Sequence, residues 1–431
     1  MSDDTERKTA AQRYAFAHNE LSAGRPAAAI SAFKQALALD PNLVPGHDHP
    51  GMALMELGRL EEEAAGATAL ADISMRLGGV LWKLGDSAGA LTAFEHSMVG
   101  NAGSAEAHYN LGSARLEAGR CAEAVESARE ALRLRPGFSE AALLCGAALA
   151  ATGAIEAGAE LVRQSGRLEM PPAQRYLLLA IRLMNSKLFA PARPCLELAL
   201  REDPDEVMAR HLLSAVAGEN PDRPADGYVR QLFDVSAATF DQELVSKLGY
   251  VIPREMVEAL NAVAGAASRP WDVLDLGCGT GLVGVEIAPY RRSLTGVDLA
   301  PNMIARARAR NLYTELRCED LVSFLSREGR YDVVTAADVF IYVGKLDAVV
   351  PAIRGVLRPG GLFAFTAEAT ETTAGYRLGV MGRYAHDAGY LRRLAAGNGF
   401  AIELLRETRI RFEHRHPVRG WLTVWRAALQ R

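Results

Sequence analysis

The sequence predicts a chain in two parts: an all-α solenoid of helical repeats, followed by a Rossmann-like α/β domain with a parallel sheet. Three observations support this prediction. Glycines recur 34 residues apart in the first half of the 431 residues, strands and helices alternate in the second half, and a glycine-rich turn follows an apolar strand there. We expect the array over residues 1–217, a linker over 218–227 and the α/β domain over 228–431.

Composition and charge are those of an ordinary globular chain. Apolar residues make up 49% and charged residues 23%, and the formal net charge is −4 at pH 7. We therefore expect neither nucleic acid nor a membrane as a partner. The polar N-terminus and the five widely spaced cysteines predict a cytoplasmic protein without disulfides or a metal centre.

The repeat period is clearest in the glycines of the first half. Gly24 and Gly58 are 34 residues apart, and so are the successive glycines Gly85, Gly119 and Gly153. The shorter step from Gly58 to Gly85 indicates one shortened repeat. Small residues at helical spacing let the two helices of a unit approach closely, so we expect about six helix–turn–helix repeats, several of them imperfect.

This half resembles the tetratricopeptide-repeat family over roughly residues 8–215. The resemblance implies a scaffold whose concave face binds a protein or peptide partner. The alternative is that the array only packs on its neighbouring domain or forms a dimer. A polar stretch rich in proline and glycine, Gly218–Gly227, then marks the linker.

After the linker, helical segments over Tyr228–Tyr250 and from Pro253 precede an alternation of strands and helices. We expect two terminal strand-like runs, Ala401–Phe412 and Trp421–Ala427, to pair antiparallel at the sheet edge. The expected strands are near 271–276, 293–298, 314–318, 331–336 and 361–367, and the expected helices near 281–289, 301–311, 320–327, 345–357 and 387–398.

The glycine-rich turn after the first strand carries the ligand signal. Its glycines are Gly277, Gly279 and Gly281, and an acid, Asp275, lies two residues before the first of them. Ligands bind at the carboxyl ends of the strands in open parallel sheets, and this turn brings backbone amides to that edge. Leu282 occupies the position of the third glycine of a dinucleotide-binding turn, so the sequence disfavours a nicotinamide dinucleotide.

These motifs resemble the class I S-adenosylmethionine-dependent methyltransferases over roughly residues 228–431. The resemblance implies that Asp298 accepts hydrogen bonds from the ribose hydroxyls of S-adenosylmethionine. The alternative for this acid is an N-cap of the helix that Pro301 opens. The resemblance also implies that an acid of Glu319–Asp320 meets the adenine amino group. The implied cofactor residues are Asp275, Gly277, Gly279, Gly281, Asp298, Leu299, Glu319, Asp320, Leu321 and Asp338.

The order of repeats and domain resembles a group of bacterial tetratricopeptide-repeat methyltransferases. In related methyltransferases the segment before the first strand covers the cofactor, which makes Tyr228, Phe233 and Phe240 candidates for a lid. The alternative is that these side chains form an apolar helix face against the sheet.

Methyl transfer needs in-line alignment, and it needs a general base only if the acceptor loses a proton. Our catalytic candidates are His386, Tyr384 and Asp338. His386 is the first choice as base because an imidazole titrates near neutral pH, and its alternative is a helix cap or surface residue beside Asp387. Further pocket candidates are Phe340, Tyr342, Glu368 and Arg383.

We expect a methyltransferase whose repeats recruit a protein or carrier-bound acceptor. One alternative is a small-molecule methyltransferase that uses the repeats for assembly. Another is a repeat scaffold with a non-catalytic methyltransferase-like domain, against which the intact glycines and Asp298 count. The fourth strand is followed by Ala-Asp-Val-Phe in place of an Asn-Pro-Pro-Tyr-like tetrapeptide, which disfavours a nucleic-acid base or glutamine side chain as acceptor.

Overall fold

The structure of the chain is a computed structural model that divides into two compact units, Met1–Pro204 and Asp205–Arg431. The first expected repeats, up to residue 66, lie almost entirely outside the described residues. The structure describes residues 67–83, 85–166, 169–224, 227–236, 240–241, 250–265, 270–327, 329–413 and 416–429, with a few isolated positions between 9 and 35.

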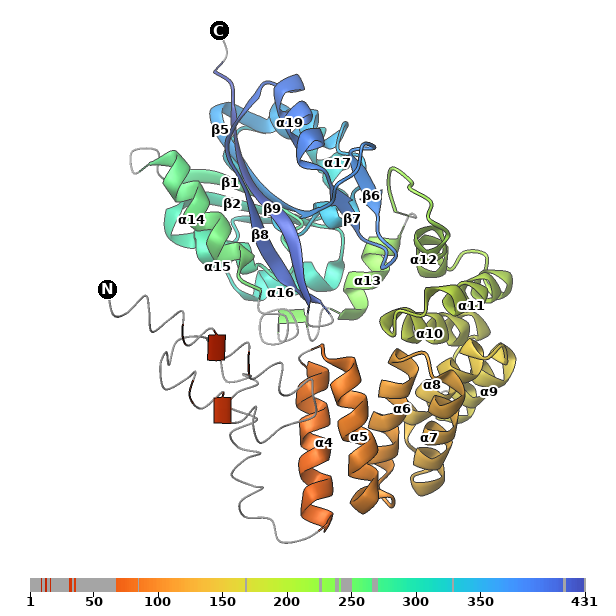
Figure 1. Ribbon diagram of the computed structural model, residues 1–431. Coiled ribbons are helices and arrows are strands. Elements are labelled where there is room, and N and C mark those ends of the chain that lie inside the picture. Colours follow the sequence, from red (N-terminus) through yellow and green to blue (C-terminus); the bar gives the residue numbers. More distant parts are fainter. Residues whose placement is uncertain are drawn as a thin grey trace. The chain divides into compact units, whose positions relative to one another are not determined.

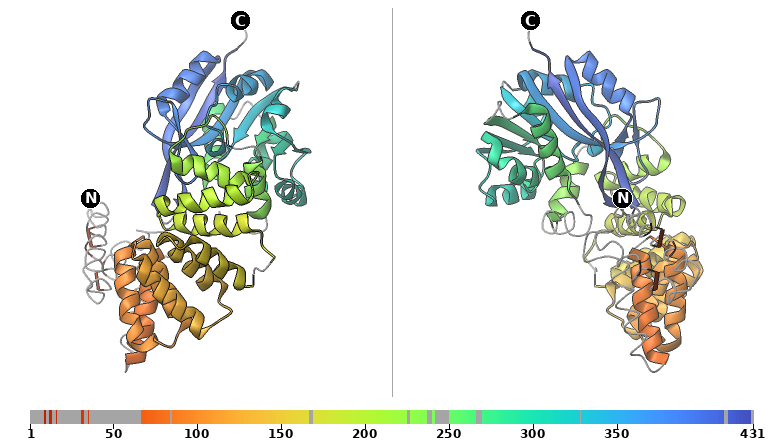
Figure 2. Two further views of the ribbon diagram at one scale, coloured as in Figure 1. Left: turned by 90° about the vertical axis from the view of Figure 1, so that its right-hand side faces the viewer. Right: turned by 60° about the vertical axis from the view of Figure 1, so that its left-hand side comes forward.

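The first unit is a stack of helix pairs, as Figures 1 and 2 show. Within each pair the two helices pack on one another, and neighbouring pairs contact in turn. This arrangement confirms the predicted helical repeat fold for the described residues. The helices are α4 (Ala67–Lys83), α5 (Ser87–Asn101), α6 (Ala105–Glu117), α7 (Cys121–Leu134), α8 (Ser139–Ala151), α9 (Ile155–Gln164), α10 (Pro172–Asn185) and α11 (Phe189–Glu202).

Small residues set the spacing of these helices, most tightly between α8 and α9. A Cβ atom built on Gly158 would lie 2.4 Å from the Gly146 carbonyl oxygen, and one built on Gly146 would lie 2.8 Å from the Gly158 carbonyl oxygen. The two backbones are therefore in direct contact. Buried alanines such as Ala124 and Ala131 play the same part on α7.

The second unit is built on a sheet of nine strands. The strands are β1 (Trp271–Leu276), β2 (Arg291–Asp298), β3 (Glu315–Cys318), β4 (Tyr331–Ala336), β5 (Leu357–Ala369), β6 (Tyr376–Leu378), β7 (Tyr384–His386), β8 (Phe400–Glu413) and β9 (His416–Ala427). The first five run parallel in the order β3-β2-β1-β4-β5, β7 and β6 extend this order beyond β5, and β9 pairs antiparallel with both β5 and β8. The predicted parallel sheet with an antiparallel edge hairpin is confirmed.

Helices cover both faces of this sheet (Figures 1 and 2). Alternation along β1 explains how: Trp271 and Val273 enter one core cluster with α14, and Leu274 and Leu276 enter another with α18 and α19. The helices of this unit are α12 (Val207–Ala217), α13 (Tyr228–Ser236), α14 (Ile252–Ala264), α15 (Leu282–Ile287), α16 (Pro301–Ala309), α17 (Leu321–Leu325), α18 (Val349–Val356) and α19 (Ala388–Gly397), with 3₁₀ turns at Ala288–Tyr290 and Phe340–Tyr342.

Helix α12 belongs to the second unit, whereas its helical periodicity predicts a place in the repeat array. The division of the chain falls between Pro204 and Asp205, before the expected linker at 218–227. The physical reason is burial, because Ala215 of α12 packs with Leu378 of β6 and Tyr384 of β7. These two short strands are also elements that the sequence analysis did not expect.

Among the described residues, no helix combines the length and the apolar character that crossing a bilayer would require.

We predict that Gly158→Ala destabilises the repeat unit by about 1–3 kcal/mol, because the added methyl group overlaps the α8 backbone. Far-UV circular dichroism during urea unfolding measures the effect. Gly137→Ala is the matched control, since a Cβ atom at Gly137 meets nothing within 4 Å and its φ is not positive. Equal midpoints for the two variants would contradict the contact.

Candidate active site

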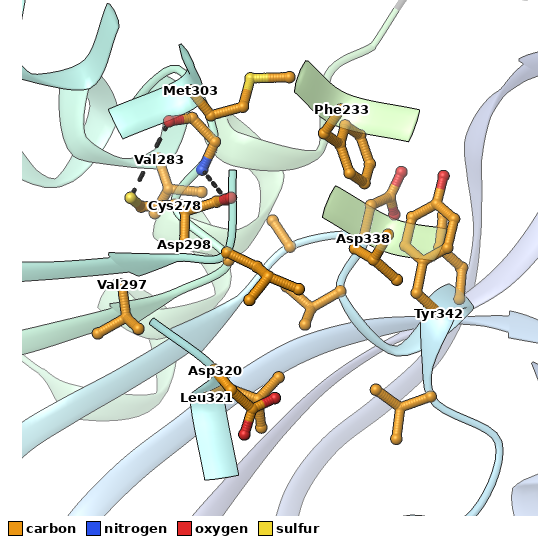
Figure 3. A pocket seen from close by; sticks show the side chains of 18 of the residues that line it. Phe233, Cys278, Val283, Val297, Asp298, Met303, Asp320, Leu321, Asp338 and Tyr342 are labelled. Atoms are coloured by element: carbon orange, nitrogen blue, oxygen red, sulfur yellow. Dashed lines mark hydrogen bonds between the residues drawn. The ribbon is translucent and has the colours of Figure 1, made fainter. Parts of the chain in front are cut away.

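A cavity of about 450 Å³ lies at the carboxyl ends of β1, β2, β3 and β4. It is lined by the glycine turn, the end of β2, the start of α17, the segment after β4 and part of α13. Figure 3 shows Asp298 near Cys278 and Met303, Asp320 beside Leu321, and Asp338 beside Tyr342 and Phe233. The sequence predicted a ligand site at this edge of the sheet.

Two glycines of the turn border the cavity for different reasons. Gly277 has φ of 61°, and a Cβ atom there would lie 2.5 Å from Val339 Cγ2, so the turn can approach the segment after β4 only without a side chain. Gly279 has φ of 53°, and a Cβ atom there would meet nothing within 4 Å. Its backbone therefore faces open space, as a turn that approaches a ligand requires.

Asp275 and Gly281 do not line the cavity. Asp275 is 1% exposed, and its two carboxylate oxygens accept hydrogen bonds from the Tyr313 hydroxyl at 2.7 Å and the Thr335 hydroxyl at 2.8 Å. Burial raises the pKa of Asp275 to about 6. The side chain thus supports the turn from behind, while Gly281 caps α15.

Asp298 ends β2 and faces the cavity. Its Oδ2 accepts a hydrogen bond from the Gly279 amide at 2.8 Å, and its Oδ1 accepts one from the Ala300 amide at 2.8 Å. Burial raises the pKa of this carboxyl, and the backbone donors oppose that shift. Each oxygen has two lone pairs, so the carboxylate can accept further bonds from a ligand.

The residues after β3 provide an acid and apolar side chains. Asp320 caps α17 with Oδ1, which accepts from the Val322 and Ser323 amides, and Oδ2 takes part in neither bond. Glu319 is paired with Arg327 through both of its oxygens. Asp320 is therefore the better placed of the two acids to meet a ligand. Glu319, Asp320 and Leu321 all line the cavity, as does Leu299 after β2.

Asp338 belongs to a buried charge cluster at the other end of the cavity. It has φ of 55°, and its Oδ1 accepts a hydrogen bond from the Thr366 hydroxyl at 3.0 Å. Arg411 Nη1 lies 3.3 Å from Asp338 Oδ2, while Nη2 donates to Glu368. Burial raises the pKa of Asp338, and the Arg411 charge opposes this. The guanidinium neutralises two carboxylates that would otherwise repel one another.

Arg411 is a cavity residue that the sequence analysis did not identify. A β-bulge between Arg409 and Arg411 interrupts the pairing of β8 with β9. Both Ile410 and Arg411 are consequently buried, at 0% and 3% exposure, although consecutive residues of a regular strand face opposite sides. No pattern in the sequence marks this bulge.

Of the candidates between residues 382 and 387, only Arg383 lines the cavity. Tyr384 and His386 are both fully buried on β7, where period-two alternation points them to the same side. His386 Nε2 lies 2.9 Å from the Gly344 carbonyl oxygen, and its ring stacks on Tyr390 at 6.2 Å. Burial lowers the pKa of His386 to about 4. We therefore do not retain His386 or Tyr384 as catalytic groups.

Two of the three lid candidates border the cavity. The Phe233 ring lies 5.8 Å from Phe240 and 5.2 Å from Tyr342, in edge-to-face contacts. Tyr228 does not line the cavity; it is 4% exposed and packs 4.0 Å from the ring of His211. Phe340, another pocket candidate, is buried in the sheet core. The aromatic pair Phe233 and Phe240 thus lines the cavity and packs against Ala300 and Met303, and Phe233 also contacts Tyr342.

The site combines acids, apolar side chains and three arginines, Arg223, Arg383 and Arg411. Within the described part of the chain, no three His, Cys, Asp or Glu residues gather as a metal site would need. The geometry suits a ligand that offers hydroxyl or amino donors to Asp298 and Asp320 and an apolar ring between them.

Comparison with known proteins identifies two families. A family model described as a methyltransferase domain matches residues 273–361, and a tetratricopeptide-repeat model matches residues 14–73, 75–137 and 109–165. A ubiquinone biosynthesis O-methyltransferase of Xanthomonas axonopodis pv. citri (strain 306) is 33% identical over 155 residues, which are 33% of this chain and 62% of that protein. The chain thus spans less than two thirds of the length of the curated relatives that it matches here.

Solved structures of the same kind are similar at low identity. Magnesium protoporphyrin IX methyltransferase from Synechocystis PCC 6803, with bound S-adenosylmethionine, is 18% identical with a TM-score of 0.36 and covers 46% of this chain and 95% of its own. An N-methyltransferase from Bradyrhizobium japonicum WM9, in complex with S-adenosylhomocysteine, is 18% identical with a TM-score of 0.38 and covers 46% of this chain and 98% of its own.

We predict that wild type loses about 2 kcal/mol of unfolding free energy relative to His386→Gln between about pH 7 and pH 5. Burial lowers the folded-state pKa of His386 to about 4. The unfolded chain therefore binds its proton first, and stability falls as the pH falls through the unfolded value near 6.5. Glutamine keeps a donor for the Gly344 carbonyl but does not titrate.

Urea unfolding of both proteins at the two pH values measures this difference, in which the contributions of the buried carboxyls cancel. Parallel pH dependence of wild type and variant would contradict the lowered pKa.

Proposed function

We propose that this chain, which combines tetratricopeptide repeats with a methyltransferase domain, is an S-adenosylmethionine-dependent methyltransferase. The observation that carries the proposal is the Asp298 carboxylate. It ends β2, is held by the Gly279 and Ala300 amides, and faces the cavity beside an open glycine backbone. A ribose presents two adjacent hydroxyl donors, which a fixed carboxylate can bind with two charge-assisted hydrogen bonds.

The residues around Asp298 fit the other parts of the cofactor. Asp320 would accept from the adenine amino group with the oxygen that does not cap α17. Leu299 and Leu321 would pack against the adenine ring, and the Gly277–Gly279 backbone would leave room for the methionine part. Asp275 would act only through the turn that it supports.

Charge also favours this cofactor over a polyphosphate nucleotide. Four acids line the cavity: Asp298, Glu319, Asp320 and Asp338. Carboxylates lining a low-dielectric cleft attract a sulfonium cation and repel phosphate groups. Arg310, which lies near the glycine turn, donates to the Thr280 carbonyl and is paired with Asp241. Next to the glycine turn the cavity thus offers the Asp298 carboxylate, where a phosphate-binding turn would need positive charge, while Glu319 is paired with Arg327 and Asp338 with Arg411.

The bound cofactor would supply the activated methyl group, and the chain's own residues would align the acceptor and exclude water. We assign acceptor alignment to the Asp338, Tyr342 and Arg383 end of the cavity. Phe233 and Phe240 would keep water out, because their packed rings border the cavity beside Tyr342. If the acceptor must lose a proton, the Asp338 carboxylate is the cavity group that would accept it, because the raised pKa of Tyr342 keeps its phenol protonated and His386 lies outside the cavity.

For the acceptor, we propose that the repeats recruit a protein or carrier-bound molecule. Family models match repeats over much of the first half of the chain, and solenoids of this type bind peptides on their concave face. Small-molecule O-methylation is the second candidate, because the curated relatives are named as ubiquinone biosynthesis O-methyltransferases. A non-catalytic scaffold is the least favoured, because Gly277, Gly279 and Asp298, which a decayed site would be expected to lose first, are present and line the cavity.

We predict that Asp298→Ala weakens S-adenosylmethionine binding by about 100-fold in isothermal titration calorimetry, because two charge-assisted hydrogen bonds are lost. The matched control is Asp272→Ala. Asp272 lies near the amino end of β1, away from the carboxyl ends of the strands that line the cavity, and it pairs with Arg292 and Arg358. Equal affinities for wild type and Asp298→Ala, or no binding by wild type, would refute the cofactor assignment.

We predict that removing residues 1–204 raises the concentration of acceptor needed for half-maximal transfer by about tenfold or more, because recruitment adds effective concentration. Cofactor affinity should change less than about twofold, since the cavity residues all belong to the second unit.

The assay follows methyl label from S-adenosylmethionine into the macromolecular and small-molecule fractions of a cell extract. Unchanged acceptor dependence in the truncated chain would remove recruitment by the repeats. Label confined to small molecules would favour the second candidate.

A further inference from the structure

Helix α12 and the segment after it contact the β6–β7 hairpin. The Asn220 side chain pairs with the hairpin backbone, accepting from the Leu378 amide at 2.7 Å and donating to the Tyr376 carbonyl at 3.1 Å. The Tyr376 hydroxyl donates to Asp222, whose carbonyl accepts from the Lys345 amide. These polar contacts fix the hairpin to residues that precede the sheet in the chain.

Helix α12 also contacts the turn of the hairpin, at Gly382. His211 of α12 is 2% exposed, and its Nε2 lies 2.9 Å from the Gly382 carbonyl oxygen. Since a carbonyl only accepts, this hydrogen bond requires the proton on Nε2. Gly382 has φ of 76°, and a Cβ atom there would lie 3.0 Å from Leu212 and 3.2 Å from the Tyr228 hydroxyl. A larger residue here would be strained by the positive φ and would press on side chains of α12 and α13.

The residue that follows this glycine is Arg383, which lines the cavity. The turn is closed by hydrogen bonds from the Gly382 amide to the Gly379 carbonyl at 2.8 Å and from the Gly379 amide to the Arg383 carbonyl at 2.7 Å. Burial raises the pKa of Tyr342, and the Arg383 charge opposes this more than any other charge does. The Arg383 charge therefore acts on Tyr342, at the acceptor end of the cavity.

We infer that His211 is a positioning residue that, through the Gly382 carbonyl, holds Arg383 against the acceptor end of the cavity. This inference rests on the proposed methyl transfer. A guanidinium has only donors, so the acceptor group that meets Arg383 presents an oxygen or nitrogen lone pair. A helix that by its sequence pattern belongs to the repeat array thus shapes the acceptor side of the cavity.

The test uses the full chain and the acceptor-containing extract fraction. His211→Leu should raise the half-saturating acceptor concentration about tenfold, as expected for loss of one buried hydrogen bond, and leave cofactor affinity within about twofold. His211→Gln places an amide donor near the position of Nε2 and should restore most of the loss. Arg210→Ala on the same helix is the control, because its side chain is half exposed and its pair with Asp205 is weak.

A double-mutant cycle tests whether the effect passes through Arg383. If it does, the half-saturating acceptor concentration of the double variant His211→Leu, Arg383→Gln should be no more than about twofold above that of Arg383→Gln alone. Additive losses in acceptor dependence, no loss in Arg383→Gln, or no rescue by His211→Gln would overturn the inference.

A readout without acceptor separates this inference from the proposed function. Phenylglyoxal modification, followed by peptide mass spectrometry, should label Arg383 at least about threefold faster in His211→Leu than in wild type, because the turn opens locally. Arg358, which pairs with Asp272 and Asp332 at the amino ends of the strands, is the internal reference. Equal Arg383 rates, or equal acceleration at both arginines, would refute positioning by His211 even if methyl transfer is found.

Discussion

The hydrogen bond from the Gly279 amide to the Asp298 carboxylate joins the turn after β1 to the end of β2, and the cavity depends on it. A buried carboxylate is costly unless donors satisfy it. Here the Gly279 and Ala300 amides hold it and set the direction of its remaining lone pairs. Asp275 fixes the same turn from behind through Tyr313 and Thr335. The carboxylate that would bind the ribose in the proposed function is thus held in place by backbone amides.

The sheet and one half of the site could be predicted from the sequence because their determinants are local. Apolar runs of strand length, glycines that need positive φ and acids at strand ends are all visible along the chain. Gly277, Gly279, Asp298 and Asp320 consequently line the cavity where the glycine turn and the next strands predicted a ligand. The repeat period was visible for the same reason, because its glycines and small residues recur at a fixed spacing along the chain.

The acceptor side could not be predicted in this way, because it depends on contacts between distant segments. Strand β7 is only three residues long, and its alternation turns His386 into the core and leaves Arg383 at the cavity. Arg411 reaches Asp338 only because a bulge turns it inward, and α12 belongs to the second unit through the burial of Ala215 and His211. His386, the first choice as a base from the sequence, is therefore a core residue.

The proposed function requires the cavity to support methyl transfer and not only ligand binding. The most direct test is to incubate the full chain with S-adenosylmethionine carrying a labelled methyl group and a bacterial extract, and to quantify methylated product and S-adenosylhomocysteine together. Both should accumulate in equal amounts over many turnovers per chain, and Asp298→Ala should lower the rate of both about 100-fold at subsaturating cofactor. Tight cofactor binding without either product in any extract fraction would contradict it.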